Sequence, residues 1–289
     1  MTIYNLGSIN IDHSYHVPNL PRPGETVAAT ALITGLGGKG ANQSIAIARA
    51  GGKVAHIGAV GADGAWTVAA LRAAGVDTGA VRVADVPTGH AMITVDAAAE
   101  NAIVLFPGAN RQIEEPQIAA ALQQAGPGDW LLLQNETNAG VAAARAARDK
   151  GLRVAYCAAP FDATAVAEIL PFTDLLSVNE GEAAQLHSAL PGAALQNCDL
   201  LVTYGSRGAA YIGPDQSVKT DAFKVDPVDT TGAGDTFLGY ALAGIDSGLT
   251  IEAALRRASA AAALQVTRPG AAEAIPEAGE VTAFLARDG

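Results

Sequence analysis

The chain has 289 residues, 49% of them hydrophobic and 5% aromatic, and its formal net charge at pH 7 is −11. This is enough for one large domain with a full core, and the acidic balance argues against a general nucleic-acid or anionic-membrane surface. With two cysteines, no Cys/His cluster at metal-ligand spacing, no basic apolar leader and no apolar run of membrane-spanning length, the sequence predicts a cytoplasmic protein.

Short apolar runs alternate with helix-like patterns along most of the chain. The predicted strands cover residues 3–9, 54–60, 130–133, 153–156, 175–178 and 200–203. The predicted helices cover residues 41–50, 65–74, 139–150, 180–190, 235–247 and 251–266. This alternation is typical of an α/β fold with a mostly parallel sheet and helices on both faces. In such sheets ligands bind beyond the carboxyl ends of the strands.

Two stretches depart from this alternation. Residues 27–34, and residues 91–95 with 102–106, look like strands joined by turns, and residues 13–17 could pair with them. Because so small a sheet has little core of its own, we expect it to pack over the main domain as a lid, or against a second subunit. An ordinary β-meander at the edge of the main sheet fits the same periodicity.

The segment Gly7-Ser8-Ile9-Asn10-Ile11-Asp12 stands at the end of the first predicted strand. Strand alternation puts Asn10 and Asp12 on one face. A carboxylate beside an amide can pair with the adjacent hydroxyls of a sugar. The alternative is a plain Asx turn that ends the strand.

Residues 35–42 form a glycine-rich segment that matches G-x-G-x-x-G. The strand that follows lacks the acidic residue that a dinucleotide ribose requires, so the dinucleotide signal is weak. The segment is not a P-loop either, because Lys39 is followed by Gly40 instead of Ser or Thr. What remains is a turn that lets the backbone approach a small ligand, with Lys39 and Asn42 as donors. The alternative is a simple strand-to-helix turn with a solvated lysine.

Polar segments also follow three other predicted strands, at residues 134–136, 179–182 and 203–208. Asn179 and Glu182 are three residues apart at the start of a predicted helix, where they could hold a hydrated magnesium ion. Equally, Asn179 could cap the helix while Glu182 completes a capping box. The segment 203–208 could be no more than a tight turn between two strands.

The segment Asp229-Thr230-Thr231-Gly232-Ala233-Gly234-Asp235 opens the predicted helix 235–247. Its glycines let the backbone approach a ligand, and the free N–H groups of a first helical turn attract anions. Asp235 would repel a bare phosphate, so its presence there requires an explanation. Either Asp235 is a helix N-cap, or it removes a proton from a nucleophile while the N–H groups hold a phosphoryl group in transfer.

Taken together, these segments resemble the ribokinase family of sugar kinases, the PfkB superfamily, over essentially the whole chain. The two family signatures are matched by Gly37-Gly38-Lys39-Gly40-Ala41-Asn42-Gln43 and by Asp229–Asp235 with Thr236-Phe237, in the family's order. The resemblance implies a ribokinase-like three-layer sandwich with a mostly parallel central sheet and a small β-sheet lid. It further implies one domain over residues 1–289, a lid built from about 13–36 and 89–106, and a homodimer formed through that lid.

The resemblance also implies the reaction, an ATP-dependent phosphorylation of a primary sugar hydroxyl, with D-ribose as the predicted acceptor and Mg²⁺ accompanying ATP. Asp235 would be the general base, and the anion hole would be formed by Gly232, Ala233 and Gly234. The sugar would be held, together with Asp235, by Asn10, Asp12, Gly38, Lys39, Gly40, Asn42 and Glu136. The ATP site would comprise Asn179, Glu182, Thr203, Gly205, Ser206, Arg207, Gly208, Gly234 and Ser259. Family members often bind potassium (K⁺), for which the matching positions are Asp229, Thr231, Gln265, Arg268 and Gly270.

Three departures from the family pattern matter. Ser259 lies where a larger polar residue often faces the adenine. Ala274 stands where ribokinases commonly carry Ser or Asn beside the potassium, so one side-chain oxygen is lost. The stretch between Glu182 and Thr203 is short, and residues 186–197 leave room for little helix. Two alternatives to a ribose kinase remain open. One is a kinase of the same family for fructose, 2-keto-3-deoxygluconate or a nucleoside, and the other is a non-catalytic nucleotide- or sugar-binding protein, including an NAD-binding one.

Overall fold

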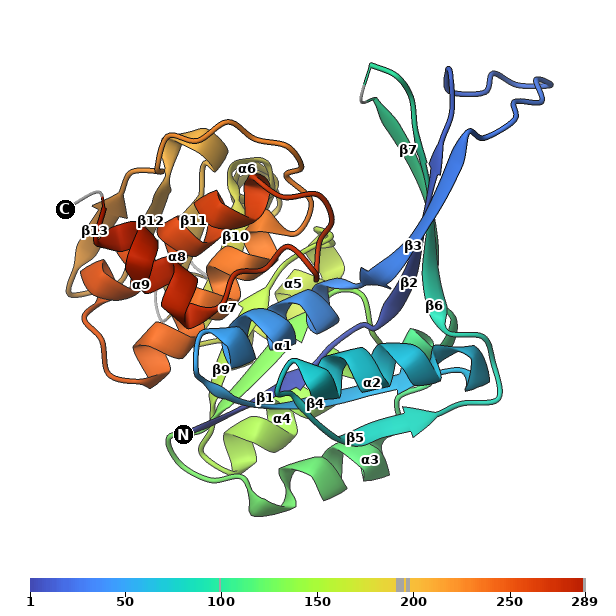
Figure 1. The fold of residues 1–289 in the computed structure, drawn as a ribbon. Coiled ribbons are helices and arrows are strands. Elements are labelled where there is room, and N and C mark those ends of the chain that lie inside the picture. The colour runs from blue at the N-terminus through green and yellow to red at the C-terminus, as the bar shows by residue number, and fades with distance from the viewer. Residues whose placement is uncertain (99, 191–194, 196–197, 288–289) are drawn as a thin grey trace.

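The computed structural model describes residues 1–98, 100–190, 195 and 198–287. The chain builds a large sheet and a separate small sheet (Figure 1). The large sheet has the strand order β13-β12-β11-β10-β9-β8-β1-β4-β5, and the small sheet has the order β3-β2-β6-β7. The strands of the large sheet are β1 (Thr2–Leu6), β4 (Lys53–Val60), β5 (Asp77–Val83), β8 (Trp130–Gln134), β9 (Arg153–Cys157), β10 (Leu175–Asn179), β11 (Asp199–Thr203), β12 (Ala209–Ile212) and β13 (Ser217–Thr220). Those of the small sheet are β2 (Asn10–His16), β3 (Ala31–Gly37), β6 (Gly89–Val95) and β7 (Asn101–Phe106).

Helices cover both faces of the large sheet. One face carries α1 (Lys39–Arg49), α2 (Ala65–Ala73), α7 (Ala233–Asp246), α8 (Ile251–Val266) and α9 (Ala278–Leu285). The other carries α3 (Glu115–Ala121), α4 (Gly140–Asp149), α5 (Ala163–Ile169) and α6 (Glu180–Ala189). Successive strand residues feed alternate cores, as Leu132 packs with the first group of helices while Leu131 and Leu133 pack with the second. The predicted three-layer α/β fold is confirmed.

Parallel pairing brings the polar strand ends together. The pairs from β5 to β11 across the large sheet are parallel, and β11, β12 and β13 are antiparallel at one edge. Asn179 at the end of β10 lies directly beside Thr203 at the end of β11, and Gln134 at the end of β8 lies beside Cys157. The predicted polar segments therefore share one edge of the sheet.

The first predicted strand is in fact two strands. β1 ends at Leu6, and after three residues the chain enters β2, which pairs with β3 and β6 in the small sheet. Asn10 and Asp12 thus belong to the small sheet. The sequence had instead predicted that they stand at the end of the first strand of the main sheet. The predicted strand 27–34 is likewise displaced, because β3 begins at Ala31 and continues to Gly37.

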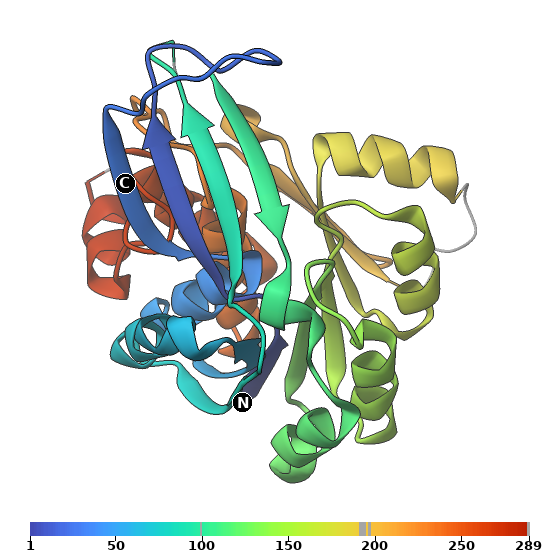
Figure 2. The ribbon, with the colours of Figure 1, turned by 90° about the vertical axis from the view of Figure 1, so that its right-hand side faces the viewer.

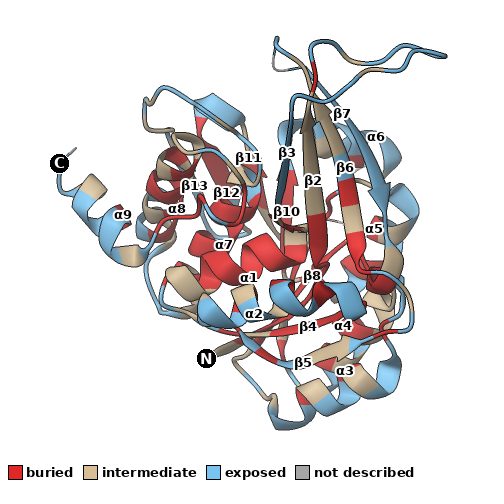
Figure 3. Cartoon of the chain, turned by 45° about the vertical axis from the view of Figure 1, so that its right-hand side comes forward, coloured by how far each residue is buried: buried red, intermediate tan, exposed pale blue. Residues whose placement is uncertain are grey.

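The small sheet rises beyond the carboxyl edge of the large sheet (Figures 1 and 2). It is a sheet of its own, and β2 and β6 pair in parallel, so the alternative of a simple meander at the edge of the large sheet is wrong. Burial falls along it from base to tip (Figure 3): Asn10 is 7% exposed, whereas Leu32 is 54% exposed.

Two further expectations concern helices. α6 ends at Ala189. The expectation of little helix over residues 186–197 falls partly outside the described residues, at 191–194 and 196–197. Within the described part of the chain, no helix is long and apolar enough to cross a membrane.

Candidate active site

Asp235 lies in the first turn of α7 and is 8% exposed. Both carboxylate oxygens accept hydrogen bonds from α1: Gln43 Nε2 donates to Oδ1 at 2.8 Å, and Asn42 Nδ2 donates to Oδ2 at 3.2 Å. The N-cap of α7 is Gly232, and no side chain caps this helix. The alternative that Asp235 is itself the N-cap is therefore wrong. A buried carboxylate that is not needed as a cap is available for chemistry.

The backbone ahead of Asp235 leaves N–H groups open. Gly232 has φ +76°, a conformation in which a residue with a Cβ would be strained. The Ala233 N–H points to the Thr230 carbonyl at 3.3 Å, but the N–H groups of Gly234 and Asp235 have no hydrogen-bond partner among the described residues. An added Cβ on Gly234 would meet no atom within 4 Å. The start of α7 therefore presents donors and open space to an anion.

The glycine turn before α1 packs directly on the end of β1. A Cβ on Gly40 would lie 2.4 Å from the Cα of Gly7 and from the Ser8 nitrogen, so the two chain segments meet backbone to backbone. Hydrogen bonds of Ser8 and Glu136 stabilise this contact. Ser8 Oγ donates to Glu136 Oε2 at 2.5 Å and accepts the Gly40 N–H at 3.2 Å, while the Lys39 N–H donates to the same Glu136 oxygen at 3.0 Å.

Asn10 and Asp12 face this turn from the small sheet. Asn10 Oδ1 accepts a hydrogen bond from Asn110 Nδ2 at 2.7 Å, and Asn110 Oδ1 accepts the Ile9 N–H at 2.9 Å. Asp12 lies over Gly37, because a Cβ added to Gly37 would be only 2.0 Å from the Oδ2 atom of Asp12. Burial raises the pKa of Asp12 to about 6, and the nearby charges of Glu136 and Glu273 add to the shift.

Lys39 connects the groups electrostatically. The carboxylate of Asp235 raises the pKa of Lys39 well above its usual value, against the opposing effect of burial, and Glu136 and then Glu182 contribute in the same direction. Lys39 therefore stays charged near three acidic residues: Glu136 in the turn after β8, Glu182 in α6 and Asp235 in α7. Lys39 is thus a cationic donor that could meet an anion beside the carboxylate of Asp235.

The residues predicted for ATP lie at the ends of β10 and β11. Asn179 and Glu182 form the capping box of α6: Glu182 N–H donates to Asn179 Oδ1 at 2.9 Å, and Asn179 N–H donates to Glu182 Oε2 at 2.8 Å. Thr203 leads into a 3₁₀ turn, η5 (Gly205–Arg207), in which Ser206 is exposed, and Gly208 with φ +93° closes the turn. Arg207 pairs with Glu180 at 2.5 Å, and Ser259 Oγ donates to the Asp221 carbonyl at 3.0 Å.

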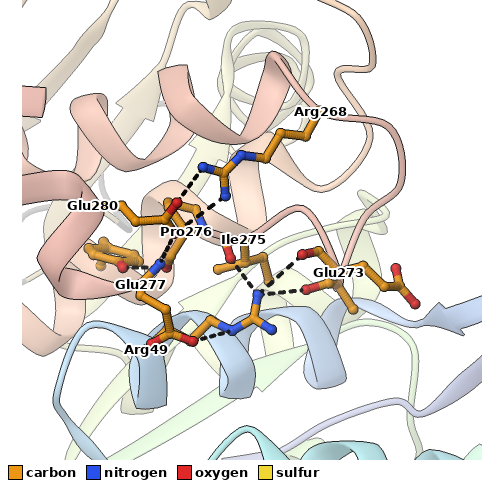
Figure 4. Close-up of polar contacts among 9 residues, drawn as sticks. Arg49, Arg268, Glu273, Ile275, Pro276, Glu277 and Glu280 are labelled. Atoms are coloured by element: carbon orange, nitrogen blue, oxygen red, sulfur yellow. Dashed lines mark hydrogen bonds and ion pairs between the residues drawn. The ribbon is translucent and has the colours of Figure 1, made fainter.

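The residues predicted to bind a cation converge beside the start of α7. The carboxylate of Asp229 accepts the Thr231 N–H at 2.9 Å and the Gly270 N–H at 3.0 Å. Gln265 is fully buried; its Nε2 donates to the Thr231 carbonyl at 2.8 Å, and its Oε1 has no hydrogen-bond partner among the described residues. Arg268 differs from the rest, because its guanidinium is paired with Glu280 at 2.6 Å (Figure 4).

The segment that carries Gly270 is anchored on α1 (Figure 4). Arg49 Nη1 donates to the carbonyls of Ala272 at 3.1 Å and Glu273 at 3.4 Å, and also to that of Ile275. Arg49 Nε also lies 3.2 Å from Glu277 Oε1. These contacts hold the segment after α8 against the helix that supplies Asn42 and Gln43. Across the described residues, no group of three His, Cys, Asp or Glu side chains could hold a metal ion.

Three side chains in these contacts were not predicted as site residues: Ser8, Gln43 and Asn110. Ser8 and Gln43 lie in segments that the sequence analysis quoted and Asn110 does not, and each of the three acts through a partner more than 90 residues away. No local pattern could therefore have assigned these contacts.

The chain is similar to known carbohydrate kinases over nearly its whole length. The model of the pfkB family carbohydrate kinases matches residues 2–278. The ribokinase of Haemophilus influenzae is 36% identical over 98% of both chains. The structure of Cryptococcus neoformans ribokinase in complex with ADP superposes with a TM-score of 0.84 at 34% identity, over 98% of both chains. Arabidopsis thaliana ribokinase complexed with ribose and ATP gives a TM-score of 0.85 at 29% identity, also over 98% of both.

The fold and these matches define the class of protein as a phosphotransferase with an alcohol group as acceptor. The chain belongs to the pfkB family of carbohydrate kinases.

Proposed function

We propose that the protein is an ATP-dependent kinase that transfers the γ-phosphate of ATP to the primary hydroxyl of D-ribose and forms D-ribose 5-phosphate in the cytoplasm. The observation that carries the proposal is the buried carboxylate of Asp235, which stands at an open helix N-terminus and is bonded to Asn42 of the glycine turn. The full-length similarity to ribokinases, one of them complexed with ribose and ATP, supports ribose as the acceptor.

In this proposal Asn10, Asp12, Gly38, Lys39, Gly40, Asn42 and Glu136 hold the sugar. Asp12 and Glu136 accept hydrogen bonds from its hydroxyls, and Asn42 offers an Oδ1 that has no partner among the described residues. Asp235 accepts the proton of the primary hydroxyl as the phosphoryl group moves. The open N–H groups around Gly234 stabilise the charge on the transferred group, with Lys39 beside them.

The nucleotide would lie along the ends of β10 and β11, against Asn179, Glu182, Thr203, Ser259 and the η5 turn. One oxygen of Glu182 is not used by the capping box and fits a water of a hydrated Mg²⁺, which would neutralise phosphate charge when bound. The unpartnered Oε1 of Gln265, with the backbone oxygens of Asp229, Thr231, Arg268 and Gly270, fits a monovalent cation. Arg268 takes part only through its backbone, since its side chain is paired with Glu280.

Residues 1–289 would form one kinase domain, in which the part of the small sheet from about 13–36 and 89–106 acts as a lid. Asp12 lies over Gly37 of the glycine turn, so the Asp12 face of the lid would be the one turned toward the sugar. Closure of this face over the sugar would exclude water and limit the hydrolysis of ATP.

A substrate panel tests the proposal. ADP release would be followed with ribose, fructose, 2-keto-3-deoxygluconate and inosine, each with and without potassium. We expect the highest kcat/KM for ribose, and a higher rate with potassium if the Gln265 site is occupied. A nucleoside or ketose preferred over ribose would contradict the assigned substrate.

Ribose binding is expected to weaken as the pH falls through about 6. The folded-state pKa of Asp12 is raised to about 6, so the carboxylate is ionised near neutral pH and becomes protonated below that value. Protonation removes a charged acceptor, so the dissociation constant for ribose should rise by up to about tenfold per pH unit below pH 6. Calorimetric titrations between about pH 7 and pH 5 measure this change. Asp12→Asn should bind more weakly with no such dependence, and a flat wild-type profile would argue against Asp12 as a sugar ligand.

We also propose that the protein dimerises through the lid. Cross-strand partners share a face of the lid, and the face opposite Asp12 carries Met92 beside Val104, with Phe106 next to His90. Val104 is 68% and Met92 47% exposed, which leaves an apolar surface uncovered in one copy.

Val104→Lys is therefore expected to shift the protein toward monomer in sedimentation velocity experiments. The matched control is Val83→Lys on β5, because Val83 is equally exposed, at 68%, but lies on the large sheet. A monomeric wild-type protein, or a dimer that Val104→Lys leaves intact, would count against this interface.

A further inference from the structure

A continuous chain of buried polar side chains leads away from Asp235 into the core. Gln43 Nε2 donates to Asp235 Oδ1 at 2.8 Å, and Gln134 Nε2 donates to Gln43 Oε1 at 2.7 Å and to Asn5 Oδ1 at 2.8 Å. Asn5 Nδ2 and Ser44 Oγ are 2.8 Å apart, and Ser44 Oγ lies 2.8 Å from the Nδ1 atom of a histidine on β4, His56. The network members Asn5, Gln43, Ser44, His56 and Gln134 are at most 2% exposed.

The donor and acceptor roles near Asp235 are fixed by its charge. An ionised carboxylate only accepts, so Gln43 must present its NH₂ group to Asp235 and its carbonyl to Gln134. Gln134 must then donate, and it gives its NH₂ group to both Gln43 and Asn5. If the amide of Gln43 turned over, its oxygen would face the carboxylate in a buried site, where the repulsion is costly.

The direction of hydrogen-bond donation is also fixed from Asn5 to His56, at the far end of the network. Because the carbonyl of Asn5 accepts, its NH₂ group donates to the Gly40 carbonyl at 2.9 Å and to Ser44 Oγ. The Ser44 hydroxyl then donates to His56 Nδ1, so the histidine carries its proton on Nε2 and donates to the Gly7 carbonyl at 3.1 Å. Burial lowers the pKa of His56 to about 4, which keeps this ring neutral. The network thus ends on Gly7 and Gly40, the two glycines in backbone contact below the sugar site.

We propose that Gln43 is a positioning residue for Asp235 and that the buried network fixes its amide orientation. This inference rests on the proposed function of Asp235 as the base. Gln43 occupies Oδ1 at the shorter distance, which leaves Oδ2, on the Asn42 side, to accept the sugar proton. The network couples that geometry to the backbone contact between Gly7 and Gly40, so the base and the sugar-binding turn are held as one unit.

Gln43→Met tests the positioning role, because methionine is of similar size and has no donor. We expect kcat to fall roughly 10- to 100-fold while KM for ribose and ATP changes by less than about threefold. Loss of a donor to the carboxylate should also move the acid limb of the kcat–pH profile to higher pH. The matched control is Gln117→Met: Gln117 Nε2 likewise donates two hydrogen bonds, to the carbonyls of Gly58 and Ala80, away from Asp235. An unchanged kcat and pH profile in Gln43→Met would overturn the proposal.

A second measurement does not depend on catalysis or on the folding of that variant. ¹⁵N NMR of the wild-type protein reports the tautomer of His56, with its signals assigned by their loss in His56→Gln. The network requires a neutral ring protonated on Nε2, and an Nδ1–H tautomer or a charged ring near neutral pH would overturn the fixed direction of the network. Absence of kinase activity on every sugar would instead refute the proposed function, so the two failures are distinguishable.

Discussion

Replacing Asp235 with asparagine is expected to lower kcat for ribose phosphorylation by roughly 10²- to 10⁴-fold, the usual contribution of a general base. An amide of the same size cannot accept the hydroxyl proton. Its Oδ1 can still accept from Gln43, and Asn42 can turn its unpartnered Oδ1 toward the new NH₂ group. The fold and the affinities for ribose and ATP should therefore change little.

Steady-state kinetics on Asp235→Asn measures the loss of kcat, and calorimetry measures the affinities for ribose and ATP. The matched control is Asp246→Asn, which makes the same change near the other end of α7, where Asp246 pairs with the amino terminus at 3.2 Å. The control should retain wild-type kcat. If Asp235→Asn keeps near-normal phosphorylation of ribose and of every other sugar tried, Asp235 is not the base.

Replacing Gly40 with alanine is expected to have the second largest effect. The new Cβ would lie 2.4 Å from the Gly7 Cα and the Ser8 nitrogen, and both atoms belong to the backbone that leads into the proposed sugar site. Relief of the overlap must separate α1 from the end of β1, at a cost of about 3 kcal/mol or more of unfolding free energy. The same displacement moves Lys39 and Asn42, so kcat/KM should fall by about 100-fold or more.

Denaturant unfolding and kinetics of Gly40→Ala test this expectation. Gly279→Ala is the control, because Gly279 lies within α9 and an added Cβ there meets no atom within 4 Å. We expect the control to match or exceed wild-type stability, since alanine favours a helix more than glycine does. Wild-type stability and activity in Gly40→Ala would show that the close contact is not required.

Much of the fold could be predicted from the sequence, because apolar periodicity marks buried elements directly. The runs at Leu131–Leu133 and Leu175–Val178 are buried on both faces, as parallel central strands are. The elements that were missed are short, lie at sheet edges or carry an alanine-rich face; they are β5, β12, β13, α3, α5 and α9. Periodicity also could not separate β1 from β2, because Ile9 and Ile11 continue the apolar pattern across the break.

The candidate site also has features that the sequence could predict and features that it could not. Segments with an unusual local composition, such as Gly37–Asn42 and Gly232–Asp235, were identifiable without a structure. Local reasoning also left two roles open for Asn179 and Glu182, and the structure forms the capping box between them. The partners of Asp235 could not be predicted, because Gln43 lies 192 residues away in the chain and only the packing of α1 on α7 brings them together.

The central claim is that the protein transfers the γ-phosphate of ATP to the primary hydroxyl of ribose. ³¹P and ¹³C NMR of the products formed from ATP and D-ribose tests it most directly. The account predicts one equivalent of ADP for each equivalent of ribose phosphate, with the phosphate on the primary hydroxyl. Phosphate on the anomeric hydroxyl, or ADP released without a sugar phosphate, would contradict it.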